Sequence, residues 1–141
     1  MSDLTKHQVT LIQESYQSIQ AQQGYLAEAF YRNLFRIAPT ARALFPEDIS
    51  GQMDKFGDML DFIVNNLGTP WIFTGKVKRL GRRHTGYGAT PEHYDIVGEA
   101  LLQAIEEMAP NSLSEAEVEA WTSGYQGIAN MMKEAAAAQA A

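Results

Sequence analysis

The chain has 141 residues, of which 45% are hydrophobic and 20% are charged, as is usual for one globular domain. Its formal net charge of −6 argues against nucleic-acid binding and against anionic membrane surfaces, and the absence of cysteine excludes disulfides and thiolate metal sites. No segment has the apolar core of a signal peptide or the roughly 20 apolar residues of a membrane span. We therefore expect a soluble cytoplasmic protein that binds neither nucleic acid nor membrane.

The first half of the chain predicts three helices separated by glycine and proline. Thr5 and Gln8 form a capping-box pattern, and apolar residues then recur every three or four positions, at Val9, Ile12, Tyr16 and Ile19. After Gly24 a second stripe runs to Pro39, through Leu26, Phe30, Leu34 and Phe35. The segment "PTARALF" stops at Pro46, and a helix should begin near Ser50 with an inward stripe of Met53, Phe56, Leu60, Ile63 and Leu67.

The second half predicts three more helices. The break at "GTPW" precedes a basic segment, residues 76–84, which Gly86 and Gly88 should end. Thr90 is a good N-cap before Pro91, and the buried stripe behind it is Tyr94, Val97, Leu101, Ile105 and Met108. Ser114 and Glu117 form another capping box, followed by Val118, Trp121, Tyr125, Ile128 and Met132. Residues 133–141 lack an apolar face and should fray, so we expect one all-α domain over residues 1–141 with six to eight helices.

Few motifs in the chain carry chemistry. There is no phosphate-binding loop and no convincing Ser/His/Asp spacing, and most carboxylates fall on solvent faces. Five of the eleven basic residues lie at positions 76, 78, 79, 82 and 83, where they could be a solvated helix face or an anchor for a small anion. His84 could be a structural histidine suited to a helix C-terminus, or it could face inward together with Leu80, one turn before it.

Three motifs decide between these possibilities. "AFYRNLFRIAPTARALF" resembles the second and third helices of globins, "LGRRHTGYGATPEHYDIVGEALL" resembles the proximal helix and the start of the next, and "AWTSGYQGIANMM" resembles the final helix. The chain is thus similar to single-domain bacterial globins and to the haem domain of flavohaemoglobins, from about residue 4 to residue 132. The resemblance implies a globin fold, a three-over-three helical sandwich, with haem b as cofactor.

The resemblance also assigns residues to the haem iron and its distal side. His84 matches the proximal histidine that ligates iron, and Phe45 matches the phenylalanine that packs on the haem face. Tyr31 matches the distal tyrosine of bacterial globins, Gln52 takes the distal position that is often histidine, and Phe56 should wall the pocket. Tyr31 and Gln52 are neutral hydrogen-bond donors at pH 7, and two donors to bound O2 imply slow O2 release. The alternative is that the loop before Gln52 turns its side chain out of the pocket, so that Tyr31 is the one distal donor.

On the proximal side, Leu80 and Val97 match packing positions and Tyr94 matches a tyrosine that holds the ligating histidine. Flavohaemoglobins also use a glutamate there, which supports redox chemistry. Its position in this chain falls on Ala136, while Glu134 is about 200° away around the helix, so the resemblance predicts no proximal carboxylate. The haem propionates could be held by Lys55 or Arg83.

The function implied by the resemblance is binding of O2, NO, CO and similar ligands at a five-coordinate iron. NO dioxygenation would require a separate reductase, because these 141 residues show no flavin or nicotinamide domain. The alternatives are a gas-binding or sensing module without turnover, and a helical sensor or interaction domain that binds no haem.

Overall fold

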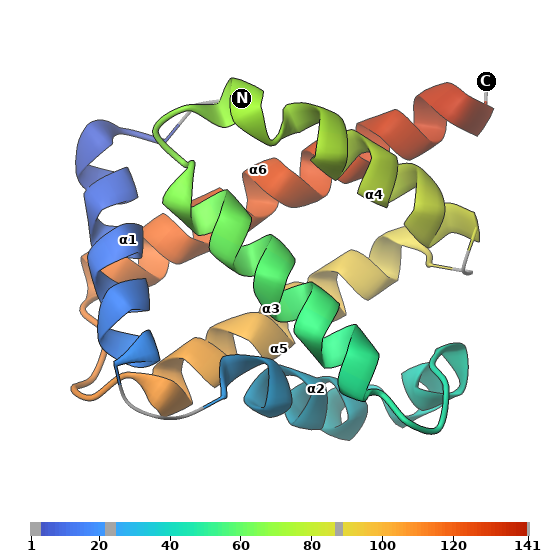
Figure 1. Cartoon of the computed structure of the whole chain (residues 1–141), viewed down its shortest axis with the longest axis horizontal. Helices are drawn as coiled ribbons and strands as arrows, with labels where there is room; N and C mark the ends of the chain where they lie inside the picture. The colour runs from blue at the N-terminus through green and yellow to red at the C-terminus, as the bar shows by residue number, and fades with distance from the viewer. Residues whose placement is uncertain (1–3, 22–24, 87–88, 141) are drawn as a thin grey trace.

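The computed structural model describes residues 4–21, 25–86 and 89–140, and every regular element in these ranges is helical. The elements are α1 (Lys6–Gln20), α2 (Leu26–Ile37), η1 (Pro39–Leu44), α3 (Ser50–Asn65), η2 (Pro70–Ile72), α4 (Thr74–Gly86), α5 (Pro91–Met108) and α6 (Glu115–Ala140). Two helices, α3 and α4, cross in front of α5 and α6 (Figure 1). The expected all-α class is confirmed, and the helices begin where the sequence places them.

Local capping explains where three of the helices start. The Thr5 amide donates to Gln8 Oε1 and the Gln8 amide donates to Thr5 Oγ1, both at 3.0 Å, so the predicted capping box is present. The second box is also present, with bonds of 2.9 and 3.1 Å between Ser114 and Glu117. The Thr90 amide donates to His93 Nδ1 at 2.9 Å, one residue before the proline that opens α5.

The buried side chains form two clusters. The larger joins α1, α2, α5 and the first part of α6, and its members include Ile12, Phe30, Tyr31, Ile105 and Trp121. The smaller joins η2, α4 and the later part of α6 through Phe73, Val77 and Met132. Accordingly α4 packs mainly on α6, whereas α3 packs on α2 and α1. The apolar core is therefore divided, with α4 belonging to the smaller part.

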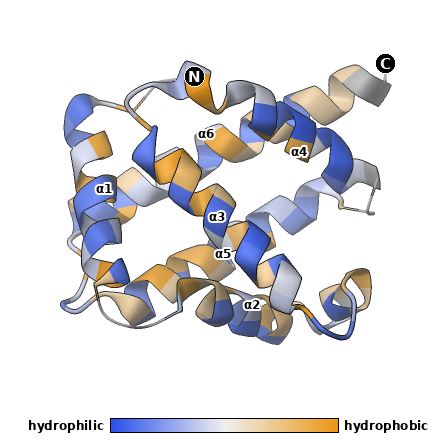
Figure 2. Ribbon diagram, in the orientation of Figure 1, coloured by the Kyte–Doolittle hydropathy of each residue, from blue (hydrophilic) through white to orange (hydrophobic). Residues whose placement is uncertain are grey.

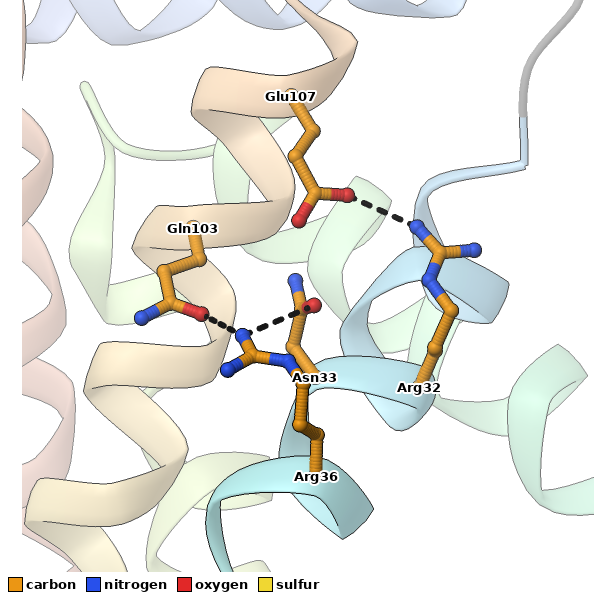
Figure 3. Close-up of polar contacts among 5 residues, drawn as sticks. All are labelled: Arg32, Asn33, Arg36, Gln103 and Glu107. Carbon is orange, nitrogen blue, oxygen red and sulfur yellow. Dashed lines mark hydrogen bonds and ion pairs between the residues drawn. The ribbon is translucent and has the colours of Figure 1, made fainter.

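Polar side chains fasten α2 to α5 along one seam (Figure 3). Arg32 pairs with Glu107 at 2.8 Å, and one turn further Arg36 donates to Gln103 and, at 3.5 Å, to Asn33 Oδ1. Both arginines bridge from the exposed side of the seam, while Asn33 itself is 2% exposed. This seam fixes the orientation of α2, the helix that carries Tyr31.

The last helix extends further than its composition suggests. We expected residues 133–141 to fray for want of an apolar face, but α6 continues to Ala140, and Ala135 is buried. The small alanine side chain is enough to pack where neighbouring helices approach closely.

None of the helices in the described residues is long and apolar enough to cross a membrane.

Candidate functional site

An aromatic cluster surrounds Tyr31 on α2. The Tyr31 ring meets Phe45 and Phe56 edge-on, with ring centroids 5.7 and 5.8 Å apart, and Phe30 stacks on Phe56 at 4.2 Å. Phe35 adds a further contact with Tyr31, at 5.9 Å. The structure therefore brings three of the predicted residues, Tyr31, Phe45 and Phe56, into one apolar wall built from α2, the end of η1 and α3.

The Tyr31 hydroxyl lies in this wall as a protonated donor. The residue is 3% exposed, and its burial raises the pKa of the phenol above its usual value. A side-chain hydrogen bond from Gln52 lowers that pKa, but burial has the larger effect. Gln52 is half-exposed and near enough to Tyr31 to influence that pKa, and its role on the distal side stays a prediction.

Arg42 holds Phe45 in place, a contact that sequence reasoning missed. Its guanidinium donates to the carbonyls of Phe45 at 3.4 Å, Pro46 at 2.8 Å and Glu47 at 2.6 Å. It also lies over the Phe35 ring, 5.2 Å from the centroid. A chain that leaves a short 3-10 helix has carbonyls without helical partners, and Arg42 satisfies three of them. The only sequence signal was an arginine three residues before Phe45 in a segment bounded by prolines.

His84 lies on the last turn of α4, half-buried, on the same side as Leu80. Its Nδ1 is 2.8 Å from the Leu80 carbonyl oxygen. Because a carbonyl oxygen can only accept, Nδ1 carries a proton, and in the neutral ring Nε2 would then carry the lone pair. This is the tautomer that a metal-ligating histidine adopts, with its other nitrogen held by a backbone carbonyl.

Tyr94 packs near α4 and α6, as part of the smaller cluster. Its hydroxyl is buried and has no hydrogen-bond partner among the described residues, and burial raises its pKa. Lys133 Nζ lies over the Tyr94 ring, 5.5 Å from its centroid, and Tyr125 donates to the Tyr94 carbonyl at 2.6 Å. Glu134 is exposed, so this side of α6 presents a lysine near Tyr94 and no carboxylate from position 134.

The predicted pocket residues are divided between the two clusters of the core, and the predicted proximal residues are found in both. Phe45, Phe56 and Val97 pack on the larger cluster, whereas Leu80 and Tyr94 pack on the smaller one. Seven residues of α2 are buried, whereas on α3 Val64 is buried and the other large apolar side chains are only partly buried. Half-exposed apolar side chains of this kind are surface that a flat apolar group would cover.

The two candidate propionate partners are placed at the surface. Lys55 on α3 and Arg83 on α4 are both exposed, and neither forms an ion pair within the described residues. Their role toward a propionate therefore stays a prediction. The glycine at position 88, which we expected to help end α4, lies outside the described residues.

A family model for globins matches residues 28–132. The chain belongs to the globin family. Among curated relatives it is 28% identical to a flavohemoprotein of Xylella fastidiosa over 94% of this chain, and 26% identical to the anaerobic nitrite reductase HBII of Casuarina glauca over 92% of it. The chain spans 34% of the flavohemoprotein and 90% of the nitrite reductase.

Solved structures show the same fold. A bacterial globin from Campylobacter jejuni superposes with a TM-score of 0.82 at 24% identity, covering 96% of this chain and 99% of that one. An engineered carbene transferase from Rhodothermus marinus gives a TM-score of 0.86 at 24% identity, covering 97% and 96%. The globin fold predicted from the three motifs is confirmed.

Membership of the globin family implies that this chain binds haem and small gaseous ligands. The residues present fit that group. A neutral imidazole with its lone pair on Nε2 is the proximal donor that haem iron takes, and half-buried apolar side chains supply the walls of such a pocket.

Proposed function

We propose that this globin holds haem b through His84 and binds O2, and also NO and CO, on the side lined by Tyr31 and Gln52. When bound, haem would supply an iron able to take up a diatomic ligand. The observation that carries the proposal is the hydrogen bond from His84 Nδ1 to the Leu80 carbonyl, which sets the ligating tautomer. Phe45, Phe56, Leu80 and Val97 would pack on the ring, with Tyr94 below His84.

Tyr31 and Gln52 would retain a polarised ligand. Because burial raises the pKa of Tyr31, its hydroxyl keeps its proton throughout the physiological range and can donate. Each hydrogen bond to a polarised ligand is worth about 1–2 kcal/mol, and about 1.4 kcal/mol is tenfold in affinity. Two such donors favour slow O2 release over rapid reversible delivery.

Slow release leaves time for a second reactant, so we propose NO dioxygenation as the activity. One NO, one O2 and one electron give one nitrate, and the electron must come from a reductase. The alternative is a gas-binding or sensing module. To separate the two, NO is added to the O2-loaded protein without further O2, and the nitrate formed per haem is measured with and without an electron donor. A protein that forms one nitrate per haem, and no more when any donor is present, is a binding module and not an enzyme.

The ligand assignment is tested by absorption spectroscopy with a matched pair of histidine variants. Purified protein and His7→Ala, whose side chain is exposed on α1, should take up one haem and show the same Soret band. His84→Ala should lose the nitrogen ligand and change that spectrum. An unchanged spectrum in His84→Ala would show that His84 is not the iron ligand. If none of the three proteins shows a Soret band after haem is added, the remaining interpretation is a sensor or interaction domain that binds no haem.

The distal assignment is tested by the O2 dissociation rate. Tyr31→Phe removes one donor without changing the ring, and O2 release should accelerate about tenfold, as expected from about 1.4 kcal/mol. Tyr25→Phe is the control, because the Tyr25 hydroxyl bonds to Asp54 at the surface. Equal dissociation rates for the two variants would remove Tyr31 from the distal role.

A further inference from the structure

The outer face of α4 is strongly cationic. Its five basic residues are all exposed, and residues 74–86 include no aspartate or glutamate. Figure 2 shows α4 as a largely hydrophilic helix beside the more hydrophobic α3. We call this surface the α4 cationic face; it consists of Lys76, Lys78, Arg79, Arg82 and Arg83.

The charges of this face are not neutralised by the fold. The one ion pair within the described residues joins Arg32 to Glu107, away from α4. Lys76 lies over the Phe62 ring at 4.5 Å, and the remaining four cations have no ion pair in the part of the chain that the structure describes. Outside α4 the chain has 17 acidic side chains against six lysines and arginines, so α4 is a helix of net positive charge in an otherwise acidic protein.

An exposed aromatic side chain adjoins this face. Trp71 is 72% exposed and Ile72 is 46% exposed, on the short η2 helix directly before α4. The next residue, Phe73, is 3% exposed and anchors η2 in the smaller core cluster. Tryptophan and arginine are the residue types enriched at the energetic centres of protein interfaces, so exposed Trp71 just before α4 and the arginines along α4 have the composition of a docking surface.

We propose that the α4 cationic face, together with Trp71, docks an acidic redox protein of the flavin or iron–sulfur class that delivers electrons to the haem. This rests on the proposed function, which needs one electron for each nitrate formed. Because His84 lies on the inner side of the same helix, a partner on its outer side approaches the iron ligand across one helix diameter, about 10 Å.

Charge complementarity favours a small acidic protein over an extended anionic surface. At physiological ionic strength, screening limits a charge to about 8–10 Å, so a partner that covers only α4 meets its cations alone. A membrane or a nucleic-acid duplex would also approach the acidic remainder of the chain and be repelled by it.

The salt dependence of haem reduction tests the charge at the site of electron entry. Ferric protein is mixed with Fe(II)–EDTA, a doubly charged anion, or with hexaammineruthenium(II), a doubly charged cation. Entry at the α4 cationic face predicts that added salt slows reduction by the anion and accelerates reduction by the cation. The net charge of −6 predicts the opposite signs, and observing those would overturn the proposal.

Two double variants of equal net charge locate the effect. Lys78→Glu with Arg79→Gln lowers the positive charge on α4, and Lys6→Glu with Gln17→Glu changes the charge by the same amount at two exposed positions on α1. With one-electron-reduced flavodoxin as an acidic protein donor, haem reduction at low salt should slow about tenfold in the α4 variant and stay near wild type in the control. Equal rates in the two variants overturn the proposal.

Two further measurements distinguish docking of a redox protein from membrane binding and from loss of the haem site. If the α4 variant alone loses cosedimentation with phosphatidylglycerol vesicles while flavodoxin reduces both variants equally, the face binds a membrane and the proposal is wrong. A failure of the haem function itself is distinguished by the missing Soret band. Docking is then still measured on haem-free protein by titration with flavodoxin, and binding that does not depend on Lys78 and Arg79 refutes it.

Discussion

The contact between α4 and α6 at Gly81 makes a sharp prediction about stability. A Cβ atom at this position would lie 2.4 Å from the Met132 carbonyl oxygen, 2.6 Å from its Cα and 2.8 Å from its carbonyl carbon. All three are backbone atoms in the interior of α6, so no side chain can rotate to relieve the contact. Since ordinary contacts are about 3.5 Å, Gly81→Ala must move α4 about 1 Å away from α6.

The magnitude follows from two opposing effects. Overpacking of this kind costs about 1–3 kcal/mol, and here it falls at the upper end because backbone must move. Alanine in place of glycine within a helix stabilises the folded state by at most about 1 kcal/mol, because its helix propensity is higher. Gly81→Ala should therefore lower the free energy of unfolding by about 2 kcal/mol, or Tm by about 8 °C for a domain of this size.

Thermal and urea unfolding of the haem-free protein, followed by circular dichroism, measures this change. Gly75→Ala is the matched control on the same helix, because a Cβ there meets nothing within 4 Å, and it should be as stable as wild type or slightly more stable. The same displacement of α4 shifts His84, three residues on, so Gly81→Ala should also bind haem more weakly. A Gly81→Ala protein as stable as Gly75→Ala would refute the close packing of α4 on α6.

Three other contacts give smaller predictions. Arg42→Met leaves three carbonyls around Phe45 without their hydrogen-bond donor, so this variant should lose haem to apomyoglobin several-fold faster than the wild type does. An unchanged rate of haem transfer would contradict a role for Arg42 in holding Phe45. Trp121→Phe removes the 2.9 Å bond to Ser15 and leaves a void, which should cost about 2 kcal/mol in urea unfolding, and a loss well below 1 kcal/mol would argue against it. Burial raises the pKa of the Tyr125 phenol above 10.0, its value in the unfolded chain. The free energy of unfolding should therefore be level up to pH 10 and fall above it, where Tyr125 ionises in the unfolded state only. A loss of stability that begins well below pH 10 in urea titrations would exclude this cause.

Helix starts could be predicted because they depend on residues within one turn. The bonds between Thr5 and Gln8, and between Ser114 and Glu117, join side chains three positions apart, so the sequence shows both partners together. The apolar stripes were predictable for the same reason, since a helix repeats every 3.6 residues. The cofactor is different: it came from a resemblance of whole motifs, and no local pattern around His84 pointed to haem.

Contacts between distant segments could not be predicted from one sequence. Gly81 and Met132 are 51 positions apart, and nothing near Gly81 shows that a helix backbone will lie against it. Arg42 was missed for a similar reason, because its partners are carbonyls, which every residue has. Gln52 was open in the sequence, since its direction depends on the loop before α3, and its interaction with Tyr31 is set by how α2 and α3 pack.

The proximal side bears on which chemistry this globin favours. In the described structure His84 Nδ1 donates to the Leu80 carbonyl, a neutral acceptor that leaves the imidazole with little anionic character. The α6 residue over the Tyr94 ring is Lys133, and Glu134 is exposed, so position 134 does not place a carboxylate beside that ring. A neutral imidazole stabilises the reduced iron that binds O2 more than the oxidised states of peroxidase chemistry. With His84 as the proposed iron ligand and Tyr31 and Gln52 as the proposed donors, both sides of the haem would favour the same outcome, ligand retention followed by reaction with a second small molecule.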